Sequence, residues 1–173
     1  MKLQSMSTTI VAVLKQLAKN QGLARLLVND ISDPYSLPVN EEVMDALIDP
    51  SSQFARIFPY SFDAEATTKD GSFIRVYYND GRFNSNETIA QSDLHIDIVV
   101  ARSLWLVSDK SKDRSYVRPY EIAGLVVDNL GRNSIGSSVK LKFDGYQHIY
   151  VNTKFDAIRL YANYMSIETS KEM

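Results

Sequence analysis

The sequence predicts a single-domain α+β protein built on a mainly antiparallel sheet with flanking helices. Two stretches in which apolar side chains alternate, Leu94–Val107 and Phe155–Glu168, predict two long strands. A helical pattern separates them, and further helical patterns precede them. The 173 residues, 45% hydrophobic and 23% charged, suffice for one domain with a buried core. We expect one domain over residues 1–173, with an N-terminal helical segment at 7–48 and an α+β core at 54–168.

The N-terminal segment begins with a helical pattern that Ser7, Thr8 or Thr9 can cap with a side-chain oxygen. Gly22 is expected to interrupt this helix, and a short apolar stripe follows until the turn-forming run 29–34. Asn40 is then expected to cap a short helix over 41–48. The apolar positions of the first helix are Ile10, Val11, Leu14, Leu17 and Ala18.

The clearest helix prediction is Pro119–Leu130, which places one helix between the two long strands. Proline is favoured at the start of a helix, Glu121 falls in the first turn, and Gly131 follows the last apolar position. The apolar face consists of Ile122, Leu125, Val126 and Leu130.

Shorter strands are predicted on either side of this helix. Residues 54–62 are read as a strand that Pro59 places at an edge or a bend, and Ser72–Tyr78 as a second strand. Residues 139–143 and 148–151 flank Asp144-Gly145, a dipeptide typical of a hairpin turn.

The first long strand has an internal irregularity. Residues 94–107 in extended form would span roughly 46 Å, well beyond a typical strand. Arg102-Ser103 breaks the alternation, so we expect a bulge or bend there, or projection of one end beyond the sheet. Val99 and Ala101 make the second face apolar as well, which predicts a sheet covered on both sides in its middle.

Two polar segments are predicted to be long loops, Asn79–Asp93 and Ser108–Ser115. Long loops in compact domains are uncommon unless they are functional or disordered, so Asn79–Asp93 is the first segment to suspect of contacting a partner. The candidate interface residues are Asn79, Asp80, Arg82, Asn84, Asn86, Lys110, Lys112 and Arg114. The alternative is a mobile surface loop without a partner.

Composition excludes several classes of function. The net charge of −2 and the pI of about 5.7 argue against a general nucleic-acid binder. The absence of cysteine removes disulfides, thiolate nucleophiles and thiolate metal sites. No secretory signal is recognised and no window approaches the roughly 20 apolar residues of a membrane span, so synthesis in the cytoplasm is expected.

No motif predicts catalytic, cofactor-binding or metal-binding residues, and we expect a protein that is not an enzyme. Residues 131–138 resemble a phosphate-binding loop, but Ser137 stands where lysine belongs and a helix precedes the segment. A glycine loop that ends a helix is the better interpretation. His95 and Asp97 would share one strand face as a conceivable acid/base pair, although a structural histidine is far more common.

The order of elements resembles the tail-terminator and neck-protein family of long-tailed bacteriophages. The similarity runs from about Leu14 onward and rests on that order and on short segments: residues 54–60, Leu94-His95-Ile96-Asp97-Ile98 and Arg118–Leu130. The family implies a non-enzymatic subunit of a ring, commonly of six copies, at the head-proximal end of the tail tube. DNA would pass through the lumen, and the subunit would reside in the virion after assembly in the host cytoplasm.

The resemblance further implies the partners: other copies of the chain, the tail tube protein and the neck or connector proteins, with no membrane. A neck connector or stopper is the main alternative within structural proteins. From a different class, a small-molecule binding or hydrolytic domain using His95 and Asp97 is the other alternative. The long loops are expected to reach neighbouring subunits or the next ring.

Overall fold

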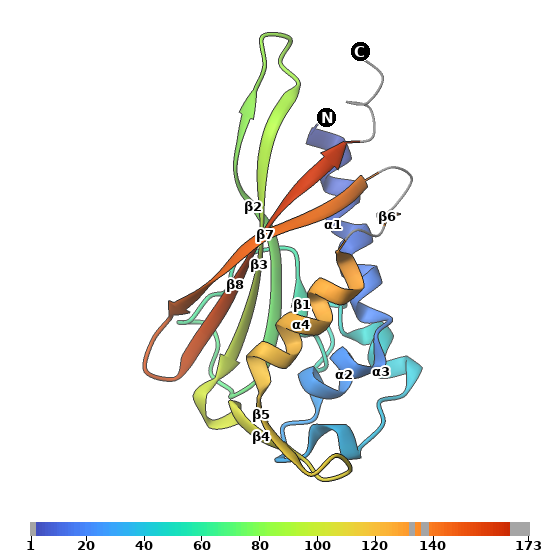
Figure 1. Ribbon diagram of the computed structural model, residues 1–173, viewed down its shortest axis with the longest axis vertical. Coiled ribbons are helices and arrows are strands. Elements are labelled where there is room, and N and C mark those ends of the chain that lie inside the picture. Colours follow the sequence, from blue (N-terminus) through green and yellow to red (C-terminus); the bar gives the residue numbers. More distant parts are fainter. Residues whose placement is uncertain (1–2, 132–133, 136–138, 167–173) are drawn as a thin grey trace.

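The computed structural model describes residues 3–131, 134–135 and 139–166, and they form a six-stranded sheet with helices against one face (Figure 1). The strand order is β1-β2-β3-β8-β7-β6, in which β1 runs parallel to β2 and every other neighbouring pair is antiparallel. The predicted α+β class is therefore confirmed. The strands are β1 (Ile57–Phe58), β2 (Ser72–Phe83), β3 (Ile89–Ala101), β6 (Ser134–Ile135), β7 (Val139–Tyr150) and β8 (Phe155–Ser166).

Four α-helices belong to the described chain: α1 (Leu3–Ala18), α2 (Gln21–Val28), α3 (Glu41–Ala46) and α4 (Arg118–Leu130). The predicted cap of α3 is confirmed, because the Asn40 side chain accepts a hydrogen bond from the Val43 amide at 2.9 Å. This helix ends two residues earlier than predicted. The predicted helix after residue 118 is confirmed as α4, whose end is marked by a hydrogen bond from the Gly131 amide to the Val127 carbonyl.

The start of α1 differs from the prediction. The helix already runs from Leu3, and the Thr8 and Thr9 hydroxyls donate to the Ser5 carbonyl instead of capping the first turn. Gly22 does not end the first helix as predicted. The helix breaks earlier, between α1 and α2, where the Asn20 side chain caps α2 by accepting a hydrogen bond from the Leu23 amide. A glycine in a first turn is tolerated, whereas asparagine is a strong cap.

The main core lies between the sheet and the helices. Alternation along β3 directs Leu94, Ile96, Ile98 and Val100 toward the helices, and all four are fully buried. Each such side chain contributes roughly 1.5–3 kcal/mol through burial. The helices supply Val13, Leu17, Leu23, Leu26, Leu27, Ile122, Val126 and Leu130 to the same core.

The opposite face of the sheet, which we call the outer face, is covered in part, as the second apolar face of the long strand predicted. A smaller cluster joins Val99 and Ala101 of β3 to Phe155 and Ala157 of β8, with Phe62 packed over them. Phe62 belongs to the segment after β1, so this chain segment crosses to the outer face. The guanidinium of Arg75 lies 4.0 Å from the ring centre of Phe58 and is also surrounded by Tyr60, Phe62 and Phe73.

The prediction of a long loop over Asn79–Asp93 is wrong. β2 continues to Phe83 and pairs with β3 from Ile89, so the segment is a hairpin whose turn covers only residues 84–88. The Asn84 side chain builds that turn by accepting from the Asn86 and Thr88 amides. Polar residues occupy both faces of this hairpin because it extends beyond the body of the protein, where no core lies against it (Figure 1).

The first long strand ends sooner than predicted. β3 stops at Ala101, and the short 3-10 helix η2 (Arg102–Leu104) redirects the chain, so the break expected at Arg102 is confirmed but Leu94–Val107 is not one strand. β4 (Leu106–Asp109) pairs with β5 (Arg114–Val117) in a separate hairpin, which replaces most of the loop predicted over 108–115. The Asp109 carboxylate accepts from the Ser111 and Lys112 amides in its turn.

Three further strand predictions change. Asp144-Gly145 is not a hairpin turn but a bulge within a continuous β7, and the turn to β8 lies at 151–154, where Asn152 accepts from the Lys154 and Phe155 amides. Of residues 54–62 only β1 is a strand, at the sheet edge beside Pro59 as predicted. In the glycine loop, residues 132–133 and 136–138 lie outside the described residues, as does the predicted end of the last strand beyond residue 166.

One buried arginine ties the N-terminal helical segment to the rest of the chain. Arg118, at the start of α4, is fully buried, and its guanidinium donates to carbonyl oxygens on both sides of it. The acceptors are Leu104 at 2.9 Å, Leu26 at 2.6 Å, Asn29 at 3.2 Å and Ile31 at 3.0 Å. Burial lowers the pKa of Arg118 from its ordinary value. The arginine thus holds the turn after α2 against the junction between η2 and α4.

Candidate functional site

The candidate interface residues fall into two groups at opposite ends of the long axis (Figure 1). One group lies on the β2–β3 hairpin, which we call the arm (residues 79–93): Asn79, Asp80, Arg82, Asn84 and Asn86. The other group lies on the β4–β5 hairpin: Lys110, Lys112 and Arg114. The structure therefore does not bring the eight residues into one site, but presents two separate projections.

The arm is strongly exposed and carries an unusual pair of charges. Phe83, close to its turn, is 61% exposed. Asp80 on β2 is directly opposite Asp93 on β3, immediately after a register shift in the ladder. Like charges at directly opposite strand positions repel each other and destabilise a hairpin. A cation beside Asp80 and Asp93 would relieve this repulsion.

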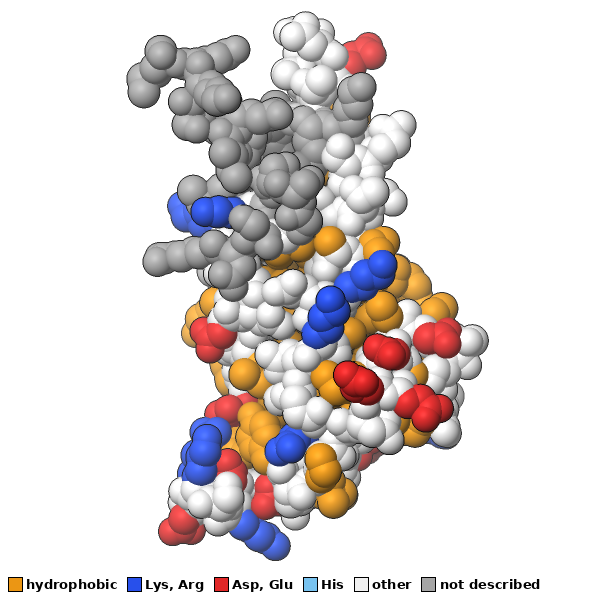
Figure 2. Space-filling model, turned by 90° about the vertical axis from the view of Figure 1, so that its right-hand side faces the viewer, with side chains coloured by type: hydrophobic (Ala, Val, Ile, Leu, Met, Phe, Trp, Pro, Cys, Tyr) orange, Lys and Arg blue, Asp and Glu red, His pale blue; other side chains and the backbone are white. Residues whose placement is uncertain are grey.

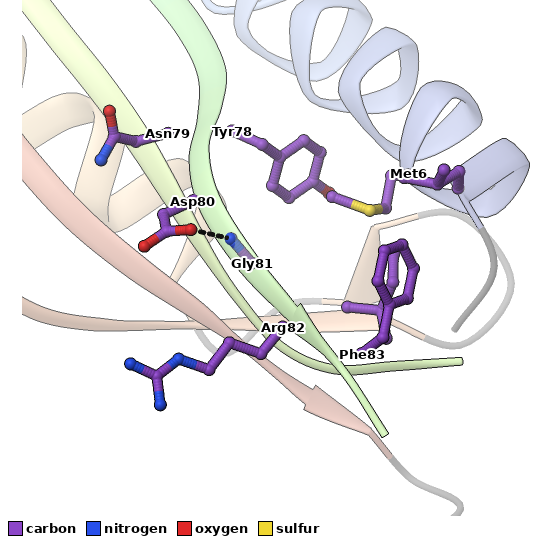
Figure 3. A pocket seen from close by; sticks show the side chains of 9 residues that line it. Met6, Tyr78, Asn79, Asp80, Gly81, Arg82 and Phe83 are labelled. Atoms are coloured by element: carbon purple, nitrogen blue, oxygen red, sulfur yellow. Dashed lines mark hydrogen bonds between the residues drawn. The ribbon is translucent and has the colours of Figure 1, made fainter. Parts of the chain in front are cut away.

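A groove of about 230 Å³ lies between the arm and the start of α1. Figure 3 shows Tyr78 and Phe83 pointing toward Met6 on α1, while Asn79, Asp80 and Arg82 point away from the helix. Burial raises the pKa of the Tyr78 hydroxyl. The volume is below the roughly 300–1,000 Å³ of small-molecule sites, so the groove is better matched to side chains of a partner protein.

The outer face of the sheet carries the His95 and Asp97 pair that sequence reasoning considered for acid/base chemistry. The Asp97 carboxylate accepts from Nε of Arg159 at 2.8 Å and from the Tyr77 hydroxyl at 2.7 Å. Burial and Asp97 together raise the pKa of Tyr77 to about 12, so its hydroxyl keeps the proton that it donates. Asp97 is therefore engaged in an ion pair with a neighbouring strand.

His95 occupies the same face but has different neighbours. Its ring packs edge-on against Tyr161 at 5.0 Å and Tyr77 at 5.6 Å between ring centres, and it is 5% exposed. Desolvation, followed by the nearby Arg159, lowers the pKa of His95. Among the described residues no hydrogen bond joins His95 to Asp97, so the arrangement is that of a packed histidine beside a salt bridge.

The β4–β5 hairpin has one fixed cation and two that point into solvent. Arg114 forms a two-pronged ion pair with Glu121 of α4, at 2.8 and 3.2 Å. Lys110 and Lys112 are exposed beside it. On the face seen in Figure 2, basic and acidic side chains are interspersed at this end of the molecule, without a continuous basic surface.

A third exposed surface was not predicted, and it follows the second half of β7. Tyr146 and Tyr150 are 66% and 65% exposed. Tyr146 packs edge-on against Tyr120 of α4, and His148 between them packs against Trp105. Exposed tyrosines grouped along one strand are typical of protein interfaces, because each ring combines apolar area with a polar tip.

A protein-family model, YomW, matches residues 20–164. The chain belongs to the YomW family. YomW is a family of phage-encoded proteins of the SPbeta-like prophage type, so the phage origin implied by the resemblance is supported at that level. No curated protein matches the chain. The match covers α2 to β8, and hence both projections and the β7 surface of this YomW-family protein.

Two further properties apply to the part of this YomW-family chain that the structure describes. None of its helices has the length and apolar character to cross a membrane. Within the same residues, histidine and carboxylate side chains form no group of three or more that could bind a metal ion.

Proposed function

We propose that this YomW-family protein is a structural protein of the phage particle. It is a tail terminator that forms a ring, commonly of six copies, at the head-proximal end of the tail and joins the tail to the neck. The family is phage-encoded, which supports a role in the phage. In the assembled virion, DNA passes through the lumen of the ring.

The observation that carries this proposal is the separation of two projections along the long axis of one domain. The arm lies at one end and the β4–β5 hairpin at the other (Figure 1). A subunit placed between two different assemblies needs a contact toward each of them. The arm exposes Phe83 and the polar residues of its turn at 84–88, and the β4–β5 hairpin exposes Lys110 and Lys112.

The first test is co-expression with the tail tube and neck proteins of the same phage, followed by light scattering and negative-stain microscopy. The proposal expects ring-sized oligomers attached to tail tubes. Protein that remains monomeric and never joins tails or necks would overturn it. Attachment to neck proteins alone, with no tail tube bound, would replace the terminator with a neck connector.

A matched pair of variants makes the test specific to the arm. Phe83→Ser removes an exposed aromatic ring from the arm, whereas Leu37→Ser removes an apolar side chain that is 50% exposed in the N-terminal segment. Both side chains are exposed, so both variants are expected to fold. The Phe83 variant should lose attachment to its tail or neck partner, while the Leu37 variant should keep it; equal attachment of both would refute the role of the arm.

The catalytic alternative has its own test. If His95 and Asp97 acted in hydrolysis or ligand binding, replacing both with alanine would abolish that activity, and the same variant would have no specific effect on tail joining beyond its loss of stability. Asp97 forms an ion pair with Arg159, and this contact supports a structural role for His95 and Asp97. A hydrolytic activity that disappears in the double variant would establish the alternative instead.

A further inference from the structure

We infer that copies of this chain join edge to edge, with the free edge of β7 (residues 142–150) in one copy pairing with the free edge of β2 (residues 76–83) in the next. The choice of a second copy as occupant rests on the proposed ring. The contact turns separate six-stranded sheets into one continuous sheet around that ring.

The first edge is the outer side of β7. β7 pairs with β8 along one side, but on the other side only Val139 and Lys140 pair with β6, and Leu141 bridges to Gly131. From residue 142 to residue 150 no strand of the described chain covers that side. Unpaired amide and carbonyl groups along an exposed strand are a template for another strand, and proteins normally protect them.

The second edge is the outer side of β2. β1 covers only Ile74 and Arg75, and beyond that point no other described strand pairs with this side. The groove beside α1 is lined by the six consecutive residues from Tyr78 to Phe83. Tyr78 and Phe83 point into this groove, which lies on the helix side of β2.

Strand direction is compatible with this pairing. β2, β3, β8 and β7 alternate in direction across the sheet, so β2 and β7 run in opposite directions within one copy. Rotation about an axis parallel to the strands preserves those directions in every copy. The β7 strand of one copy and the β2 strand of the next are then antiparallel, like the rest of the sheet, and the contact is head-to-tail, as a closed ring needs.

Charge identifies the partner more closely. Asp80 and Asp93 lie opposite each other on β2 and β3, and Figure 3 shows Asp80 pointing away from α1, toward the outer face. Lys142 on β7 pairs with Asn163 of β8, whose alternation with Arg159 also places it on the outer face. Lys142 is exposed and has no ion-pair partner among the described residues. In a continuous sheet the lysine of one copy and the two carboxylates of the next share a face.

The other face is complementary as well. Tyr146 of β7 lies on the helix side of the sheet, where it contacts Tyr120 of α4. On that side the β2 edge is bordered by the groove between Met6 and Phe83. Edge pairing therefore brings an exposed aromatic strand beside an apolar groove while the lysine meets the aspartates on the opposite face.

The absence of cysteine in the natural chain allows a direct test. One population carries Lys142→Cys, Asp144→Cys or Gln147→Cys, and the other carries Asp80→Cys or Arg82→Cys; the two are mixed, assembled with the tail and neck proteins, and oxidised. Paired strand residues lie roughly 4.5–5.5 Å apart, within the range that a disulfide bridges. We expect a linked dimer from at least one combination and background linkage only with Leu37→Cys as the control.

Charge exchange tests the same contact without cross-linking. Lys142→Asp and Asp80→Lys should each reduce ring formation at least tenfold, and the two substitutions together in one chain should restore it. If tails and rings form while no cysteine pair links above the control, edge pairing is wrong and the proposed function survives. If the pairs link and the charge exchange restores self-assembly but tails never bind, edge pairing stands and the terminator role fails. Protein that stays monomeric with every partner overturns both.

Discussion

Removing the buried guanidinium of Arg118 is expected to destabilise the whole domain. The side chain donates four hydrogen bonds to the carbonyl oxygens of Leu26, Asn29, Ile31 and Leu104, at 2.6 to 3.2 Å. In Arg118→Met a flexible apolar chain of similar length occupies the space, and the carbonyl oxygens lose their donor. These carbonyls belong to two segments far apart in sequence, so the junction between the N-terminal segment and α4 weakens.

The magnitude follows from opposing terms. Hydrogen bonds from a charged donor contribute about 1.5–3 kcal/mol each, so four bonds give a gross effect of roughly 6–12 kcal/mol. Burial of the guanidinium, which lowers the pKa of Arg118, removes several kcal/mol of that gain because the charge has left water. The net loss expected for Arg118→Met is on the order of 3–5 kcal/mol, a large part of a typical stability of about 5–15 kcal/mol.

Urea denaturation followed by far-ultraviolet circular dichroism measures this loss, with Arg102→Met as the control. The Arg102 side chain is 47% exposed and its single ion pair to Asp156 is long, at 3.5 Å, so its removal should change stability by less than about 1 kcal/mol. Arg118→Lys should fall between the two, because an ammonium group lacks the planar fork that reaches several acceptors. A loss below about 1 kcal/mol in Arg118→Met, equal to the control, would refute the reasoning.

The other predictions concern stability and its dependence on pH. Ile98→Ala should lower the free energy of unfolding by about 2–5 kcal/mol in urea denaturation, because it opens a cavity at a fully buried position, whereas Ile98→Val should cost only about 0.5–1.5 kcal/mol. Asn40→Ala should cost about 1 kcal/mol by removing the cap of α3, and Asn40→Ser should retain most of it; equal losses in both would contradict the capping role. Because the pKa of His95 is lowered from 6.5 in the folded protein, the unfolded chain binds the proton more readily. The contribution of His95 should be constant above about pH 6.5 and should reduce stability as the pH falls below that value. His95→Phe should remove this part of the pH dependence, and an unchanged slope between about pH 6.5 and 5 would show that other groups cause it.

Sequence patterns predicted the elements that pack against the core and failed where no core is present. The apolar periodicity of α4 reflects one buried face, and the alternation of β3 reflects the large apolar side chains that it directs toward the helices, so both were recognisable. In the arm most of the described residues are exposed, and its polar residues are indistinguishable from those of a loop. Asp144-Gly145 misled for a related reason, because the same dipeptide serves a tight turn or a strand bulge, and the pairing with β8 decides which.

The strand order decides which strands have an exposed edge, and the hydrophobic periodicity of the sequence does not reveal strand order. The sequence patterns of β7 and β8 both indicate strands. Only the strand order shows that β8 is central and that most of β7 is at an edge. The candidate residues on the arm and the β4–β5 hairpin were chosen as loop residues, and the structure places them on two hairpins at opposite ends. The tyrosines of β7 gave one usable signal, because Tyr146 and Tyr150 are four positions apart and therefore lie on the same face of a strand.

The sheet ends at both sides in strands of only two residues, β1 and β6, and their brevity has a consequence for alignment. Each occupies one end of the strand beside it: β1 lies against Ile74 and Arg75, and β6 against Val139 and Lys140. An incoming strand that pairs with β2 or β7 would collide with β1 or β6 at that end, so it cannot shift further along the edge. A one-residue slip would turn every side chain to the wrong face, so a physical stop on each side limits the registers available to an incoming strand before any side chain has been compared.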